Sequence, residues 1–166
     1  MPLPLEIRGG LSSSFSLCPV RFGAGSGEDS IDLVTTRGAS PCRVVLPAEA
    51  DAFTVRRVRL HERAGGFHRW RVRLIDRDAL PGLSSKGVSG EGTETFGYFE
   101  PTRYYEQVRV LHYEFEDSGT VGYCPVAGGD PVRVVTSRAT RKGHLRLPRH
   151  GYVTMSGGGG WRVSVT

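Results

Sequence analysis

Lysine is almost absent from this chain of 166 residues, in which two lysines stand against 20 arginines. A skew of this size is expected of a GC-rich genome, so an arginine here is weak evidence for phosphate or carboxylate recognition. Long apolar runs are missing too, because no stretch approaches the roughly 18 consecutive apolar residues of a membrane-spanning helix. The first residues, MPLPLEIRGG, lack the positive region and apolar run of a secretory signal. We therefore predict a soluble, cytoplasmic protein.

Closely spaced cysteines are missing, which removes the commonest metal-binding motif. Cys18, Cys42 and Cys124 are far apart in the sequence, and each lies next to a proline. Without a secretory signal, three reduced thiols are favoured over one disulfide. His61, Glu62 and His68 are close together, but we expect the two histidines on opposite faces of a hairpin, whereas His144 and His150 belong to a basic segment that we expect to be a solvated loop. The sequence therefore predicts neither a metal site nor a cofactor.

Recognisable catalytic and nucleotide-binding motifs are absent as well. The chain has no GxSxG segment that would present a serine nucleophile. The glycines of GAGSGE at 23–28 precede no helical pattern, which a dinucleotide-binding fingerprint requires. Glu114, Glu116 and Asp117 could act as acids, but glycoside hydrolysis needs two carboxylates that usually come from different strands. An enzyme is therefore the less favoured interpretation.

Helical spacing of apolar residues is also lacking, apart from one possible turn at 47–53. Strand-like segments instead recur about every 10 to 14 residues between Gly, Pro, Ser and Asp clusters. This pattern predicts an all-β fold with very little helix, an antiparallel β-sandwich of jelly-roll or immunoglobulin-like type that forms a single domain over 1–166. The expected strands are 4–8, 15–22, 30–36, 42–47, 55–63, 67–75, 95–100, 104–116, 120–124, 131–137, 144–148, 151–156 and 161–166.

What the sequence does have is an alternation of basic and apolar residues within segment 55–77, in which the apolar positions between the basic ones are Val58, Leu60, Trp70, Val72 and Leu74. If residues 64–66 form a hairpin loop, Arg59 lies opposite Arg71 and Arg57 opposite Arg73, with Leu60 on the buried face. Trp70 lies on that buried face too. Like charges opposite one another are destabilising, so this face needs acidic neighbours or an anionic partner. The basic side chains that would share the face are Arg57, Arg59, His61, Arg69, Arg71 and Arg73.

Charge is strongly segregated along the chain, which gives two interpretations of this face. Residues 51–78 carry a net charge of +4, residues 79–130 carry −5, and residues 131–166 carry +7 with no acidic residue. Strands that contain Glu106, Glu114 and Glu116 could lie beside the arginines and neutralise them. Alternatively, the arginine face and the C-terminal segment form one basic surface for nucleic acid or an anionic polysaccharide.

Aromatic residues are concentrated in segment 96–106, directly after the Gly- and Ser-rich segment 82–94, which we expect to be a long mobile loop. Exposed rings beside such a loop could stack on a sugar or a peptide side chain. The alternative is that the rings fill the core at a corner of the sandwich. The candidate contact residues here are Tyr98, Phe99, Tyr104 and Tyr105.

Four glycines at 157–160 form a second unusual segment, expected to be either a flexible hairpin tip or a place where another backbone comes close.

These features together favour a non-enzymatic binding or assembly module. Its partner would be a protein or a second copy of the chain, or else a carbohydrate, held by loops and by aromatic or charged surface. The second hypothesis is binding of a polyanion by the arginine face. The third is a carbohydrate-active enzyme of jelly-roll type.

Overall fold

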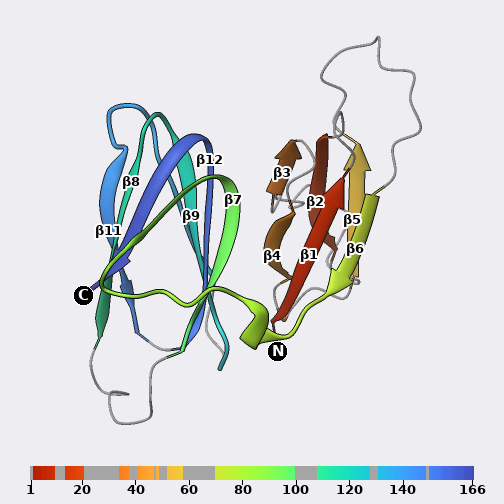
Figure 1. Cartoon of the computed structure of the whole chain (residues 1–166), viewed down its shortest axis with the longest axis horizontal. Coiled ribbons are helices and arrows are strands. Elements are labelled where there is room, and N and C mark those ends of the chain that lie inside the picture. Colours follow the sequence, from red (N-terminus) through yellow and green to blue (C-terminus); the bar gives the residue numbers. More distant parts are fainter. Residues whose placement is uncertain are drawn as a thin grey trace. The chain divides into compact units, whose positions relative to one another are not determined.

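A computed structural model describes residues 2–9, 14–20, 34–37, 41–46, 48, 52–57, 70–99, 108–127, 131–148 and 150–166. The chain divides into two compact units, an N-terminal unit, Pro2–Ile75, and a C-terminal unit, Asp76–Thr166, each of which is described here by itself (Figure 1). The expectation of a single domain stays a prediction. The fold is all-β with antiparallel strand pairs, as predicted, and the described ranges contain one helix, the 3₁₀ turn η1 (Arg77–Ala79). None of the described residues belongs to a helix long and apolar enough to cross a membrane.

The N-terminal unit contains two three-stranded sheets, with strand orders β4-β1-β6 and β3-β2-β5. In the first sheet, Leu5 and Ile7 of the central strand point to an apolar face, and Glu6 and Arg8 point to the opposite face. The apolar face forms a small core of Leu5, Ile7, Cys42, Val44 and Leu46. The strands are β1 (Leu3–Gly9), β2 (Ser14–Val20), β3 (Val34–Arg37), β4 (Cys42–Leu46), β5 (Ala52–Arg57) and β6 (Trp70–Leu74).

The predicted arginine hairpin is wrong, because its two ends belong to different sheets. Arg57 of β5 lies opposite Phe15 of β2, and Arg73 of β6 lies opposite Glu6 of β1. This pairing places a carboxylate, rather than a second guanidinium, opposite Arg73, which removes the predicted like-charge repulsion at this one position. The offsetting acid comes from the first strand of the chain and not from the acidic segment 79–130.

The same pairing changes the other predicted contacts of this segment. Arg71 lies opposite Arg8, whereas its expected partner Arg59 is outside the described residues. The expected faces of β6 are correct for Val72, which packs against the small core, but Leu74 is 66% exposed where a buried side chain was expected. Leu60 also lies outside the described ranges.

The C-terminal unit is one curled sheet of six strands with the path β10-β9-β12-β8-β11, and β7 pairs with β12 (Figure 1). Its core is the larger of the two apolar clusters and includes Phe96, Leu111, Phe115, Val153 and Trp161. β8 lies within the strand expected at 104–116, and its side chains alternate with a period of two, since Leu111, Tyr113 and Phe115 are buried. The strands are β7 (Val88–Tyr98), β8 (Arg109–Phe115), β9 (Gly119–Pro125), β10 (Val132–Val135), β11 (Lys142–Leu147) and β12 (Gly151–Val165).

The glycine segment at 157–160 is where β12 changes its pairing partner. Residues 151–157 pair with β9, residues 161–165 pair with β8, and β7 follows β12 through both parts. The register with β7 shifts between Ser156 and Gly160, so the glycines form a bulge at a corner of the sheet. The expected hairpin tip between two short strands is wrong. The alternative, a close approach, is correct, since a Cβ on Gly157 would lie 3.3 Å from the backbone oxygen of Ser118.

Two further expectations are corrected by the described strands. The segment 82–94 is not one long loop, because residues 88–94 belong to β7 and pair with β12. Segment 47–53 contains the start of β5 at Ala52, so its last two residues are strand rather than helix. The glycines and serines of segment 82–94 predicted a loop, but cross-strand pairing outweighs the weak strand preference of these residues.

Candidate functional site

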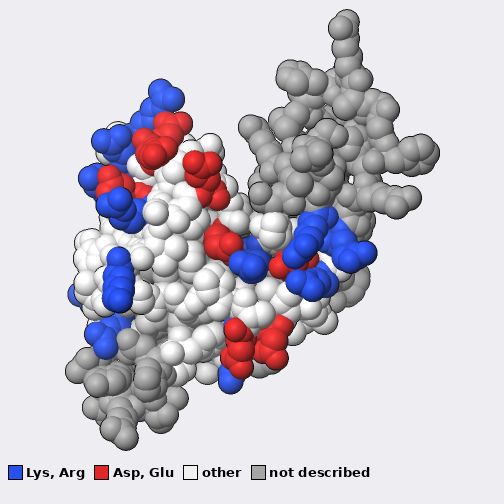
Figure 2. All heavy atoms as spheres, in the orientation of Figure 1, with Lys and Arg blue, Asp and Glu red and all other residues white. Residues whose placement is uncertain are grey.

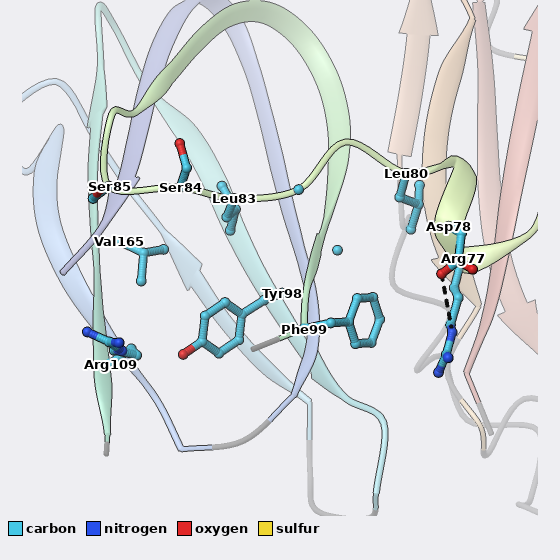
Figure 3. A pocket seen from close by; sticks show the side chains of 12 residues that line it. Arg77, Asp78, Leu80, Leu83, Ser84, Ser85, Tyr98, Phe99, Arg109 and Val165 are labelled. Carbon is cyan, nitrogen blue, oxygen red and sulfur yellow. Dashed lines mark ion pairs between the residues drawn. The ribbon is translucent and has the colours of Figure 1, made fainter. Parts of the chain in front are cut away.

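A pocket of about 430 Å³ opens in the C-terminal unit and contains two of the predicted contact residues, Tyr98 and Phe99 (Figure 3). One wall is the segment from η1 to Ser85, and a second is the end of β7 with Phe99. Arg109 of β8 and Val165 of β12 complete the lining. The volume lies within the range of about 300–1,000 Å³ that is usual for ligand pockets.

Backbone pairing fixes the two main walls against each other at Gly97. The Gly97 N–H donates to the carbonyl oxygen of Pro81 at 2.9 Å, and the Leu83 N–H donates to the carbonyl oxygen of Gly97 at 3.2 Å. A Cβ on Gly97 would lie 2.7 Å from the ring of Phe99. Glycine at this position therefore lets the Phe99 ring fold back against its own strand at the mouth of the pocket.

Phe99 is 36% exposed, yet three neighbours hold its ring in place. The ring packs edge to face against Tyr152, with centroids 5.5 Å apart, and against His150 at 6.0 Å. The guanidinium carbon of Arg77 lies 5.6 Å from the ring centroid, which is a cation–π geometry. The aromatic surface is thus fixed before any ligand arrives, so binding costs little side-chain entropy.

The polar groups of the pocket are unevenly charged. Two arginines, Arg77 and Arg109, line it together with one carboxylate, Asp78, which pairs with Arg77 at 3.5 Å. Figure 3 shows the phenol of Tyr98 pointing toward the side on which Arg109 lies. Among the described lining residues, Asp78 is the sole acid, whereas glycoside hydrolysis needs two. The described lining therefore suits recognition of an anionic or hydrogen-bonding group.

Sequence reasoning located the aromatic part of this pocket and missed the rest. Tyr98 is only 5% exposed and belongs to the main core, so for its ring the core interpretation is correct. Tyr104 and Tyr105 lie outside the described residues. Arg77 and Arg109 were not singled out, because no local pattern marks them: Arg77 lies in η1 and Arg109 in β8, and both line the pocket only in the folded chain.

The arginine-face residues lie in the N-terminal unit. Arg71 and Arg73 are exposed on β6, and Arg57 belongs to β5. The structure does not describe Arg59, His61 or Arg69.

Burial raises the pKa of Tyr152 above its ordinary value of 10.0, and the nearby Arg77 charge offsets only part of this increase. Because the folded phenol holds its proton longer than the unfolded one, its contribution to stability is complete below pH 10 and is lost as pH rises above it. We expect the difference between the 295 nm absorbance titrations of the parent protein and Tyr152→Phe to have its midpoint above pH 10. A midpoint at or below that value would show that the phenol is solvated.

Metal-ligating groups do not gather in the part of the chain that the structure describes, where no three His, Cys, Asp or Glu side chains could hold an ion. Cys42 and Cys124 are both thiols rather than disulfide-bonded, with Cys42 buried and Cys124 half-buried. The side chain of Cys18 lies outside the described structure. No known protein family and no curated protein sequence matches the chain.

Proposed function

We propose that the chain is a non-enzymatic binding module that holds a segment of a protein partner in the pocket beside Phe99. The curled sheet of the C-terminal unit serves as its sandwich-like scaffold. The observation that carries the proposal is a ring that is exposed and fixed at once, since Phe99 is held by Arg77, His150 and Tyr152. Fixed aromatic side chains of this kind are typical anchors of binding surfaces.

The lining favours a peptide segment with one apolar and one acidic side chain. Leu80, Leu83 and Val165 supply apolar surface, which rewards the burial of an aliphatic or aromatic group. Arg77 and Arg109 exceed the single carboxylate of Asp78 by one charge, and a guanidinium pairs well with a carboxylate. Ser84 and Ser85 add exposed hydroxyl groups at the same wall.

Phe99→Ala should weaken binding of a selected peptide by about 30-fold, equivalent to about 2 kcal/mol, because truncation removes the aromatic anchor. The peptide is first obtained by selecting a random phage-displayed library on the parent protein, and its dissociation constant is then measured by isothermal titration calorimetry. Val135→Ala is the matched control, since Val135 is 71% exposed on β10 and does not line the pocket.

Three outcomes would oppose this function. A selected peptide that binds Phe99→Ala as tightly as the parent would place the site elsewhere. A glycan array that retains the parent but not Phe99→Ala, with no peptide enriched, would make the ligand a carbohydrate. A dimer that Phe99→Ala dissociates, seen by size-exclusion chromatography with light scattering, would make the partner a second copy of the chain.

A further inference from the structure

The sheet β4-β1-β6 collects four arginines around one carboxylate on the face opposite its apolar core. Glu6 of β1 is opposite Arg43 on one side and Arg73 on the other. Arg8 is two residues further along β1, on the same face, and lies opposite Arg71. These arginines, named the arginine cluster below, are Arg8, Arg43, Arg71 and Arg73.

The buried carboxylate of Glu6 binds several side chains of this cluster. Its Oε1 accepts from the Nε of Arg8 at 2.8 Å and from the Nε of Arg73 at 3.0 Å, and its Oε2 lies 3.7 Å from the Nε of Arg43. Only 3% of the Glu6 side chain is exposed. Burial alone would raise the pKa of this carboxyl, but the hydrogen bond from Arg8 and the charge of Arg73 outweigh it and hold the pKa below its ordinary value.

The carboxylate orients the guanidinium groups without neutralising them. Four arginines and one glutamate leave a formal charge of +3 on this part of the described surface. The side chains of Arg8 and Arg73 are each 56% exposed, although their Nε atoms bond to Glu6. Figure 2 shows basic side chains gathered over β1 and β6 on the viewed face.

We propose that the arginine cluster binds the phosphate backbone of a nucleic acid, a site in the N-terminal unit that is independent of the Phe99 pocket. A guanidinium presents paired N–H donors that match two oxygens of one phosphate group. Neighbouring strands lie about 4.8 Å apart, so the sheet spaces its arginines regularly for successive charged groups. The ion pairs with Glu6 already restrict the side chains of Arg8, Arg43 and Arg73, so these arginines lose less conformational freedom on binding, which favours affinity.

The test measures fluorescence anisotropy of a fluorescein-labelled, mixed-sequence 20-nucleotide single-stranded DNA with the full chain between 50 and 200 mM salt. Arg8→Gln/Arg71→Gln should weaken binding at least tenfold at low salt. It should also reduce the slope of log K against log salt by about 1.4, the value for two lost phosphate contacts on a single strand. The matched control, Arg133→Gln/Arg146→Gln, removes two exposed arginines from β10 and β11, and should change the affinity by less than about twofold.

The single variant Arg71→Gln tests binding in a protein that should keep its fold, because no bond joins Arg71 to Glu6 in the described structure. It should still weaken DNA binding about threefold. If both double variants lost the same amount of DNA affinity, the net charge of the protein alone would explain the loss, and the proposal would be overturned. Binding of a heparin hexasaccharide without binding of the DNA would assign the cluster to a sulfated polysaccharide instead, and absence of DNA binding at 50 mM salt would refute it. Phe99→Ala should leave DNA affinity unchanged, which separates this proposal from the peptide-binding function.

Discussion

Replacing Gly119 by alanine should destabilise the C-terminal unit by about 3 kcal/mol, at the upper end of the cost of overpacking a core. The added Cβ would overlap the ring of Phe115 and lie 2.6 Å from the backbone oxygen of Ser156. Phe115 is 1% exposed and has no room to move. The residue cannot shift away either, because its N–H donates to Thr136 Oγ1 at 2.8 Å and its carbonyl oxygen accepts from the Thr136 N–H at 2.8 Å. Urea denaturation followed by circular dichroism measures the loss.

Gly122→Ala provides the control in the same strand. Its Cβ would lie 3.8 Å from the Cβ of Thr154, which is ordinary van der Waals contact. This substitution should leave the free energy of unfolding unchanged or raise it by about 0.5 kcal/mol, since alanine restricts the unfolded chain. Equal destabilisation by both variants would show that any added side chain at these glycine positions of β9 destabilises the unit, whether or not it overlaps a neighbour. If Gly119→Ala had no effect, the backbone at this corner of the sheet would be able to shift and make room for the added methyl group.

Alternation along single strands was sufficient to predict the fold class and much of the core. In β8 the inward positions Leu111, Tyr113 and Phe115 are all buried, and His112 between them is exposed. The reason is local, since successive side chains of a strand point to opposite faces whatever its partner. Clusters of turn-forming residues were a weaker guide to the ends of strands, since residues 88–94 and 157–160 lie inside β7 and β12.

The partners of the strands could not be predicted in the same way. Alternation in β6 correctly gave one face to Arg71 and Arg73, but the acid that pairs with Arg73 lies 67 residues away, in β1. The segment that contains β5 has the same alternation and lies close in the sequence, so the sequence alone favoured it as the partner of β6. One sequence signal did exist, because Glu6 is an acid between the apolar residues Leu5 and Ile7, and such a residue needs a basic neighbour if it is buried.

The glycine bulge and the pocket were hidden for a related reason. Successive glycines predict either a loose turn or a close approach, and only the pairing of β12 with both β8 and β9 decides between them. The pocket is built from segments that are distant in sequence, so only its neighbouring aromatic residues, Tyr98 and Phe99, could be selected in advance.

Glu6→Gln should destabilise the N-terminal unit by about 2 kcal/mol at pH 7, because it leaves the arginine cluster without its carboxylate. Loss of one partner from a fully buried ion pair costs about 3–5 kcal/mol. The carboxylate of Glu6 is almost fully covered, but largely by the arginines themselves and not by a thick layer of protein, so solvent screens part of the interaction. Hydrogen exchange measured by mass spectrometry on β1 and β6 peptides, with β12 peptides as the internal reference, localises the effect.

The pH dependence of this difference follows from the lowered pKa of Glu6. A carboxyl whose pKa is lower in the folded state contributes stability above its unfolded pKa, near 4.3, and loses that contribution as pH falls through the folded value. The stabilities of the parent and Glu6→Gln, measured by urea denaturation, should therefore differ at pH 7 and converge as pH falls through the lowered pKa of Glu6 in the folded protein.

Glu114→Gln is the control for this pH dependence, since Glu114 pairs with Lys142 at 2.8 Å on the exposed surface, where we expect no measurable change in stability. If Glu6→Gln behaved like this control at pH 7, Glu6 would not hold the arginines in place, and the ordering that we propose for the arginine cluster would be wrong.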